Sequence, residues 1–281
     1  KARLRRVPLR LPAPLSVGLV KGCGDALSEA LQALAGAGLG MTLTLLTADD
    51  LRAADLNKLH TIILDNHTAQ SRPEVLDAKE RLMQFMQDGG NVVCLSHHAD
   101  EWNRKPPAQP QVAPKLPATQ AQGESNPLAA QPPAETKAPA AQPQPAAEPA
   151  GAPCGELAPY PIELSTERVT DENSEVLILD HRHPLLLSPC RIWERDFQGW
   201  VQERGANFPK KWAPEFTPLL SCADPHEKAL DGGLLVCDVG AGSFIYTCLA
   251  WHEQLRIGNP GAYRMLANMI SYPRVRRGGK R

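Results

Sequence analysis

Three short, almost entirely apolar runs constrain the fold of the first hundred residues. They occupy residues 15–20, 60–64 and 91–95. Their length and their content of Val, Ile and Leu are typical of strands, and a strand that is apolar on both faces needs cover on both faces. Helical segments alternate with these runs, so the sequence predicts an α/β fold in which helices cover both sides of a mainly parallel sheet.

Boundary residues place the expected helices between these strands. Asp25 is positioned to cap a helix over residues 26–35, and a second helix over residues 73–87 begins with proline at its first turn. Between the two helices, residues 41–46 indicate a further strand and residues 47–50 a turn.

The second half predicts further short strands and an antiparallel hairpin near the C-terminus. Gly240-Ala241-Gly242 separates the two hairpin strands, residues 234–239 and 243–250. A closing helix over residues 261–270 is expected to stop before Pro273, which cannot donate a backbone hydrogen bond. The other predicted strands are residues 162–164, 176–179 and 218–222.

The composition changes abruptly near residue 105. Residues 105–153 are dominated by Pro, Ala and Gln without an apolar period, so they cannot bury enough surface to offset the entropy of ordering. We expect a disordered, partly polyproline-II insert that splits one domain into halves at residues 15–104 and 154–272. Basic tails, residues 1–14 and 273–281, flank the domain. A proline-rich insert is also a candidate for docking a partner protein.

Charge and cysteine content narrow the classes of function. The net charge of −1 gives no global field for nucleic acid or an anionic membrane, and no apolar run reaches the roughly 18–20 residues that span a bilayer. The seven cysteines show neither a disulfide framework nor zinc-finger spacing, which favours the cytoplasm. The chain starts at Lys1 rather than Met, as we expect of a piece of a longer protein. Export of that longer protein therefore stays an alternative to the cytoplasm.

The most specific sequence motifs lie after residue 157. They are Ala158-Pro159-Tyr160-Pro161, Arg168-Val169-Thr170-Asp171-Glu172, His183-Pro184-Leu185-Leu186, Asp196-Phe197-Gln198-Gly199-Trp200-Val201-Gln202-Glu203-Arg204-Gly205 and Pro260-Gly261-Ala262-Tyr263-Arg264. With Gly22, Gly24-Asp25 and Gly89-Gly90 in the first half, they resemble the class I glutamine amidotransferase-like domain that is fused behind LmbE/PIG-L-type deacetylases in bacteria. The resemblance implies a flavodoxin-like three-layer sandwich, and a deacetylase domain or a larger assembly as a partner. It implies no assigned reaction.

The chain departs from that family at the carboxyl ends of the predicted third and fourth strands. Relatives have an Arg-Ala-Tyr-Asn-like and a Gln-Tyr-Asn-like segment there, where this chain has Asn66-His67-Thr68-Ala69 and Cys94-Leu95-Ser96. Ligands of such sheets bind at the strands' carboxyl ends. We therefore expect a degenerate, non-catalytic accessory domain that binds an unknown small ligand or a partner. The candidate crevice residues are Gly22, Gly24, Asp25, Asn66, His67, His97 and His98.

Two enzymatic alternatives use residues of the same crevice. In a hydrolase of the amidotransferase-like fold, Ser96 would be the nucleophile on a sharp strand-to-helix turn and His252 its base, although the bulky His97 and His98 beside Ser96 suit such a turn poorly. In a metal-dependent enzyme, His97, His98 and His252 would be ligands, as imidazoles suit zinc and related ions. A third alternative is a structural component of a larger assembly, held by the insert and the basic tails.

Other residues have plainer interpretations. Gly18, Gly22 and Gly24 match neither common nucleotide-binding spacing, so we expect a tight turn there and no cofactor. His183 belongs to a predicted packing turn. Residues 196–204 are amphipathic, and within them Glu203 and Arg204 are expected to form an internal ion pair rather than to contact a ligand.

Overall fold

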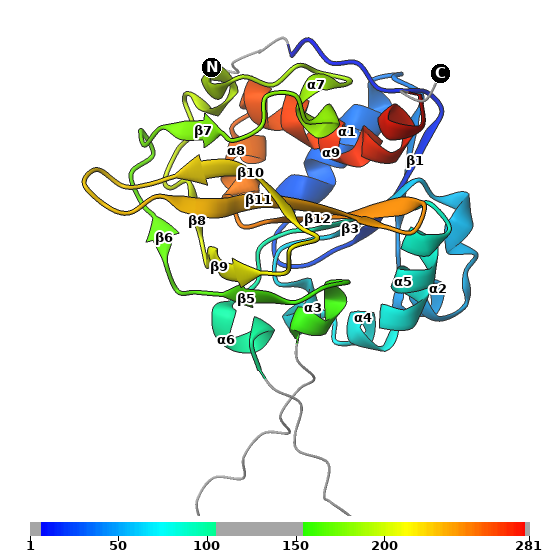
Figure 1. The fold of residues 1–281 in the computed structure, drawn as a ribbon. Helices are drawn as coiled ribbons and strands as arrows, with labels where there is room; N and C mark the ends of the chain where they lie inside the picture. The colour runs from blue at the N-terminus through cyan, green and yellow to red at the C-terminus, as the bar shows by residue number, and fades with distance from the viewer. Residues whose placement is uncertain (1–6, 105–153, 279–281) are drawn as a thin grey trace, which may run out of the picture. The chain divides into compact units, whose positions relative to one another are not determined.

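The computed structural model describes residues 7–104 and 154–278, with side chains described for residues 7–104 and 155–272. These two stretches form one compact α/β unit with helices on both faces of a central sheet (Figure 1). The predicted insert at residues 105–153 lies outside the described residues, as do residues 1–6 and 279–281 of the predicted tails.

The central sheet combines a parallel half with an antiparallel half. Neighbouring strands from β2 to β12 are parallel, whereas β11, β10 and β7 extend the sheet through antiparallel pairs. This confirms the prediction of an α/β fold with a mainly parallel sheet and a C-terminal antiparallel hairpin. In the described residues the strand order is β2 (Met41–Leu45), β1 (Leu15–Val20), β3 (Thr61–Leu64), β4 (Asn91–Cys94), β12 (Gly242–Thr247), β11 (Leu230–Val239), β10 (Thr217–Cys222) and β7 (Val176–Ile178).

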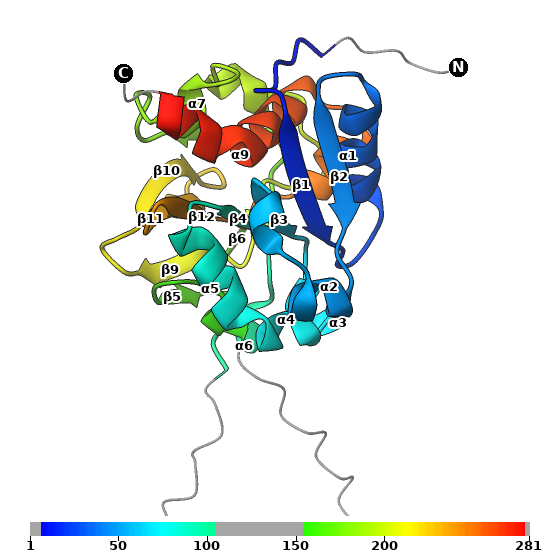
Figure 2. The same cartoon turned by 90° about the vertical axis from the view of Figure 1, so that its right-hand side faces the viewer.

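Helices cover both faces of this sheet because its central strands are apolar on both sides. One face is covered by α1 (Ala26–Gly36), α8 (Trp251–Arg256) and α9 (Pro260–Gly278), and α5 (Lys79–Gln87) lies on the other (Figures 1 and 2). The shorter helices are α2 (Ala48–Ala53), η1 (Leu56–Lys58), α3 (Thr68–Ser71), α4 (Glu74–Asp77), α6 (Ala99–Trp102), η2 (Cys154–Leu157), α7 (Pro184–Leu187) and η3 (Glu194–Phe197), where η marks a 3-10 helix.

Two small antiparallel sheets carry the motifs of the second half toward the carboxyl edge of the parallel strands. β5 (Ile162–Leu164) pairs with β9 (Pro209–Trp212), and β6 (Arg168–Val169) pairs with β8 (Gly205–Ala206). Gly205 also bridges Leu249, just beyond β12. The motifs that contain Arg168 and Gly205 therefore lie beside the end of a central strand.

Hydrogen bonds tie together the chain on the two sides of the insert. The indole nitrogen of Trp102 donates to the carbonyl of Ile162 at 2.9 Å. Asn103 makes two bonds to the backbone of Leu164, at 2.7 and 2.9 Å. The last described helix before the insert is thus fixed directly against the first strand after it.

Several predicted elements differ in the structure. Residues 47–50 are not a turn but the start of α2, because Thr47 and Asp50 form a reciprocal capping box. The predicted helix at 73–87 is divided at Ala78 into α4 and α5. The amphipathic stretch at 196–204 is a 3-10 turn followed by irregular chain, since Gly199 and Gln202 adopt positive φ angles of 68° and 70°.

The closing helix α9 continues past Pro273, contrary to the prediction. A proline inside a helix leaves the carbonyl four residues earlier without its donor, which here is the carbonyl of Met269. The side-chain nitrogen of Asn91 supplies that bond at 2.9 Å. Asn91 also accepts from Ser243 Oγ at 2.8 Å and donates to Thr61 Oγ1 at 3.2 Å. A buried amide at the start of β4 therefore joins three central strands to α9.

We expect Asn91→Ala to destabilise the fold by about 2–4 kcal/mol. The substitution leaves the Met269 carbonyl and the Ser243 hydroxyl buried without this partner, and each such loss costs about 1–3 kcal/mol. Urea unfolding of the two proteins measures the difference. Asn57→Ala, at an exposed asparagine, is the matched control and should stay within about 0.5 kcal/mol of wild type. Equal losses in both variants would contradict a special role for Asn91.

Candidate functional site

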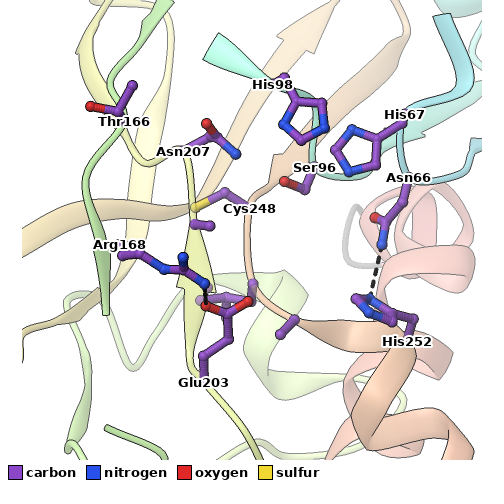
Figure 3. A pocket seen from close by; sticks show the side chains of 14 residues that line it. Asn66, His67, Ser96, His98, Thr166, Arg168, Glu203, Asn207, Cys248 and His252 are labelled. Atoms are coloured by element: carbon purple, nitrogen blue, oxygen red, sulfur yellow. Dashed lines mark hydrogen bonds and ion pairs between the residues drawn. The ribbon is translucent and has the colours of Figure 1, made fainter. Parts of the chain in front are cut away.

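A cavity of about 370 Å³ lies at the carboxyl ends of β3, β4 and β12 (Figure 3). Its first-half wall consists of Asn66, His67, Ser96 and His98. Its second-half wall carries polar side chains from the small sheets and from α8, so the site is completed by residues far apart in the sequence. These are Thr166, Arg168, Glu203, Asn207 and His252, together with Cys248.

Asn66 is the most deeply buried polar side chain of the wall, with 6% of its surface exposed. Its amide nitrogen lies 3.0 Å from Nδ1 of His252. Its carbonyl oxygen, Oδ1, is buried without a hydrogen-bond partner. Which of the two groups donates in this bond depends on the tautomer of His252, whose Nε2 lies 3.6 Å from the Glu253 carboxylate.

The backbone around Asn66 is held by the buried carboxylate of Asp65. Asp65 accepts from the backbone N–H of Asn66 at 2.8 Å and of Gly22 at 3.2 Å. Cys23 N–H donates to the carbonyl of Asn66 at 3.0 Å. A Cβ on Gly22 would lie 2.1 Å from that carbonyl oxygen, so only glycine allows this approach. Burial raises the pKa of Asp65 to about 6, although these backbone bonds and Lys21 oppose the shift.

The same close approach moves the cavity away from β1. Gly22, Gly24 and Asp25, which the sequence placed in the crevice, do not line it, because the loop after β1 packs directly on the backbone of Asn66. Asp25 occupies the N-cap position of α1 without making a side-chain capping bond, since its carboxylate pairs with Lys21. The predicted N-cap position of Asp25 is therefore confirmed, but its side chain does not cap the helix.

His67 lines the cavity in a strained conformation. Its φ of 53° is left-handed, a region that non-glycine residues enter rarely and that is frequent at functional sites. Its ring stacks on that of His98 with centroids 4.0 Å apart and planes 17° apart. Burial, with smaller contributions from His98 and His252, lowers the pKa of His67 to about 4. The ring is therefore neutral at pH 7, and its buried Nδ1 has no partner.

His97 faces the core rather than the cavity. It is fully buried, and both ring nitrogens are engaged: Nδ1 donates to the Leu95 carbonyl at 2.8 Å and Nε2 accepts from the Ala69 N–H at 3.4 Å. Burial lowers its pKa to about 4. The proposed ligand set His97, His98 and His252 is thus not assembled. In residues 7–104 and 155–272, no three His, Cys, Asp or Glu side chains gather to hold a metal ion.

Ser96 lines the cavity but is not activated as a nucleophile. Among the described non-glycine residues positive φ angles occur at His67, Gln202, Asn207 and His226, so the strained turn lies after β3 and not at Ser96. The imidazole of His252 is bonded to Asn66 and not to Ser96. The structure therefore places the proposed pair in one cavity without joining it. Burial also raises the pKa of Cys248 well above its usual value, which keeps that thiol protonated.

The second-half wall contains residues that sequence reasoning missed or misassigned. Glu203 lines the cavity and pairs with Arg168, whereas it was expected to pair internally with Arg204. Arg204 is buried instead against the carbonyls of Ser174 and Phe197, at 2.8 and 2.6 Å. Arg168 and Glu203 lie in two of the specific motifs of the second half of the sequence, but no sequence pattern indicated that these motifs meet.

Asn207 completes that wall through its side chain. Its Oδ1 accepts from the N–H of Ala99 at 3.3 Å, so its amide nitrogen remains for the cavity (Figure 3).

The predicted packing role of His183 is confirmed, since its Nδ1 caps α7 by accepting from Leu185 N–H and its ring stacks on Tyr272.

Comparison with known proteins gives distant structural likenesses. No protein-family model and no curated protein match the chain. A solved structure described as a GMP synthase subunit from Thermoplasma acidophilum is 11% identical, with a TM-score of 0.47 over 96% of this chain and 98% of its own. A cold-adapted β-galactosidase from Rahnella sp. R3 is 13% identical, with a TM-score of 0.45 over 92% of this chain and 31% of its own. With both TM-scores below 0.5, these likenesses identify neither a reaction nor a ligand.

The buried state of His97 predicts a pH dependence of stability. Its pKa is about 4 in the fold against an ordinary 6.5, so between these values the unfolded chain binds a proton that the folded chain does not. Stability from this group therefore rises with pH across that window, by up to about 1.4 kcal/mol per pH unit. His97→Gln should remove this contribution from the slope. The raised pKa of the buried Asp65 makes stability fall with rising pH instead, but Asp65 is present in both proteins and so does not affect the difference between their slopes.

Urea unfolding of wild type and His97→Gln at a series of pH values from 4 to 7 measures the two slopes. A variant with the same slope as wild type would show that His97 titrates at its ordinary pKa.

Proposed function

We propose that this chain is a flavodoxin-like, amidotransferase-like accessory domain that binds a small polar ligand without transforming it. The order of its parallel strands, β2-β1-β3-β4-β12, is the 2-1-3-4-5 order of flavodoxin-like sheets, which supports the finer assignment of fold. The specific motifs of the second half, such as residues 196–205 and 260–264, support the link to deacetylase-associated domains.

The polar lining of one cavity carries the proposal of ligand binding. The cavity of about 370 Å³ lies where parallel sheets of this order bind ligands, at the carboxyl ends of the strands. Hydrogen-bonding side chains from both halves of the chain line it: Asn66, His67, Ser96, His98, Arg168, Glu203, Asn207 and His252. A small polar ligand would therefore meet hydrogen-bonding groups on both walls.

Three features argue against catalysis by the same site. Ser96 does not adopt a positive φ angle, Nδ1 of His252 is bonded to Asn66 rather than to Ser96, and burial keeps the Cys248 thiol protonated. Nucleophilic catalysis needs a nucleophile hydrogen-bonded to its base or a lowered thiol pKa. The cavity has neither, and it is therefore better suited to recognition.

The partner remains part of the proposal. We propose a deacetylase domain, or a larger assembly that contains one, on the motif resemblance alone. The insert, residues 105–153, would be a contact element because its proline-rich sequence suits docking to a partner protein.

A thermal-shift experiment on the full chain tests ligand binding. The probes are four chemical classes: neutral sugars, primary amides, carboxylates and amines. We expect one class to raise the melting temperature of wild type and of Asn57→Ala but not of Asn66→Ala. Loss of the Asn66 hydrogen bond should weaken binding about tenfold, which corresponds to about 1.4 kcal/mol. If no class acts, or if the shift persists in Asn66→Ala, the ligand-binding proposal fails.

The absence of catalysis is tested with chromogenic ester and amide substrates. We expect wild type to show no turnover above the uncatalysed rate, and Ser96→Ala and His252→Ala to leave this baseline unchanged. Turnover by wild type that both substitutions abolish would replace the proposal with the hydrolase alternative.

A further inference from the structure

We propose that the ligand of this cavity carries an oxyanion, a carboxylate or a phosphate group, which binds beside Asn207, Ser96 and Arg168. The inference rests on the proposed ligand-binding function and names the chemical class of that ligand. It is carried by the sign of the charge on the whole lining, by the excess of hydrogen-bond donors over acceptors, and by a strained residue that bears one of these donors.

The lining of the cavity carries no net negative charge at neutral pH. Its titratable side chains are those of His67, His98, Arg168, Glu203, Cys248 and His252. Arg168 and Glu203 form an ion pair and neutralise each other. Burial keeps the His67 ring neutral and the Cys248 thiol protonated. The two remaining imidazoles are neutral or positive and never negative, so the sum over the lining is zero or positive and favours an anion over a cation.

Carboxyl groups close to the lining residues do not reverse this sign. Glu253 pairs with Arg256, and Asp65 accepts from two backbone N–H groups. Burial raises the pKa of Glu101, which opposes its ionisation, and Glu167 is exposed to solvent. None of these four carboxyl groups lines the cavity. A ligand therefore meets one carboxylate in the lining, that of the ion pair.

The lining offers more hydrogen-bond donors than acceptors. Oδ1 of Asn207 accepts from Ala99, so the amide nitrogen, which can only donate, remains for a ligand. The guanidinium of Arg168 has several N–H donors, of which Nη2 bonds Glu203. The Ser96 hydroxyl points toward the same part of the cavity as the Asn207 amide nitrogen (Figure 3). These donors need acceptors, and an ionised carboxylate or phosphate group offers acceptors alone.

One residue in each wall holds a left-handed backbone. The φ angle is 53° at His67 and 58° at Asn207. Asparagine enters this region more readily than most residues, but such conformations are still uncommon and are frequent at functional sites. In the second-half wall the residue with the strained backbone is thus the same residue whose amide nitrogen remains for a ligand. This coincidence supports Asn207 as part of the binding site.

Calorimetric titration of the full chain with two matched sets of probes tests this inference. The first set is glycerate, glycerol 3-phosphate, glycerol and 3-aminopropane-1,2-diol, and the second is glucuronate, glucose 6-phosphate, glucose and glucosamine. Within each set the carbon skeleton is kept and the charge changes. We expect an anion of at least one set to bind at least about tenfold more tightly than its neutral and cationic counterparts, which cannot make the charge-assisted hydrogen bonds. The tighter of the two anions distinguishes a carboxylate from a phosphate.

Three variants connect the binding to this cavity. Asn207→Asp keeps the oxygen that accepts from Ala99 but replaces the donor nitrogen by a carboxylate oxygen, so it should weaken anion binding about tenfold or more. Arg168→Gln removes an exposed cation and should have the same effect. Asn57→Asp adds the same charge as the first variant at an exposed position of η1 and should leave the binding unchanged.

The outcomes separate this inference from the function beneath it. Binding of a neutral or cationic probe as tight as that of the anions overturns the oxyanion and leaves a ligand-binding domain. Anion binding that Asn207→Asp and Arg168→Gln both leave unchanged also overturns the inference, since the anion then binds outside this cavity. Absence of binding by every probe overturns both the inference and the proposed function. Arg168 has an exposed side chain, so Arg168→Gln gives a folded test protein even if Asn207→Asp does not.

Discussion

The arrangement of this domain depends on one buried amide, that of Asn91. It stands where β3, β4 and β12 begin, and it bonds Thr61, Ser243 and the carbonyl of Met269 in α9. Buried polar groups are costly unless all are satisfied, so a network of this kind favours one relative position of sheet and helix over others. The pairing of β4 with β12 brings together strands from the two sides of the insert. The Asn91 amide thus helps to hold together a sheet whose strands come from both sides of the insert.

At the opposite end of the same strands, close backbone packing decides where a ligand can enter. Asp65 holds the loop after β1 against the loop after β3, and Gly22 permits a contact that any side chain would prevent. The space beside β1 is therefore filled, and the cavity opens over β3, β4 and β12 instead. The Asn66 side chain is then supported from behind by a fixed backbone, which is the kind of preorganisation that a selective site needs.

The sequence predicted the parallel half of the fold well, because strands buried on both faces leave a continuous apolar pattern. It failed where specific side-chain hydrogen bonds, one local and one long-range, decide the structure. The capping box of Thr47 and Asp50 made a helix from an apparent turn, and Asn91 allowed α9 to pass Pro273. Neither effect leaves a trace in the apolar periodicity of the sequence. The bond from Asn91 to Met269 also joins residues more than 170 positions apart.

Among the candidate residues taken from the sequence, those near the cavity lie in the loops after β3 and β4 and on α8. Asn66, His67, Ser96, His98 and His252 line it. His97 does not, because its ring is fully buried in the core and bonds the backbone of Leu95 and Ala69. Arg168, Glu203 and Asn207 escaped prediction because the small sheets that deliver them are too short to leave a pattern.

The protein itself engages several polar groups of the cavity wall. Burial holds the His67 ring uncharged, and the Arg168 guanidinium pairs with Glu203. Asn66 and His67 each leave a buried polar atom unpaired, and His67 also adopts a strained backbone. Such costs reduce stability by a few kcal/mol in total. Backbone strain of this kind is frequent at functional sites, so under the proposed function the interaction of a ligand with this wall would offset part of the cost.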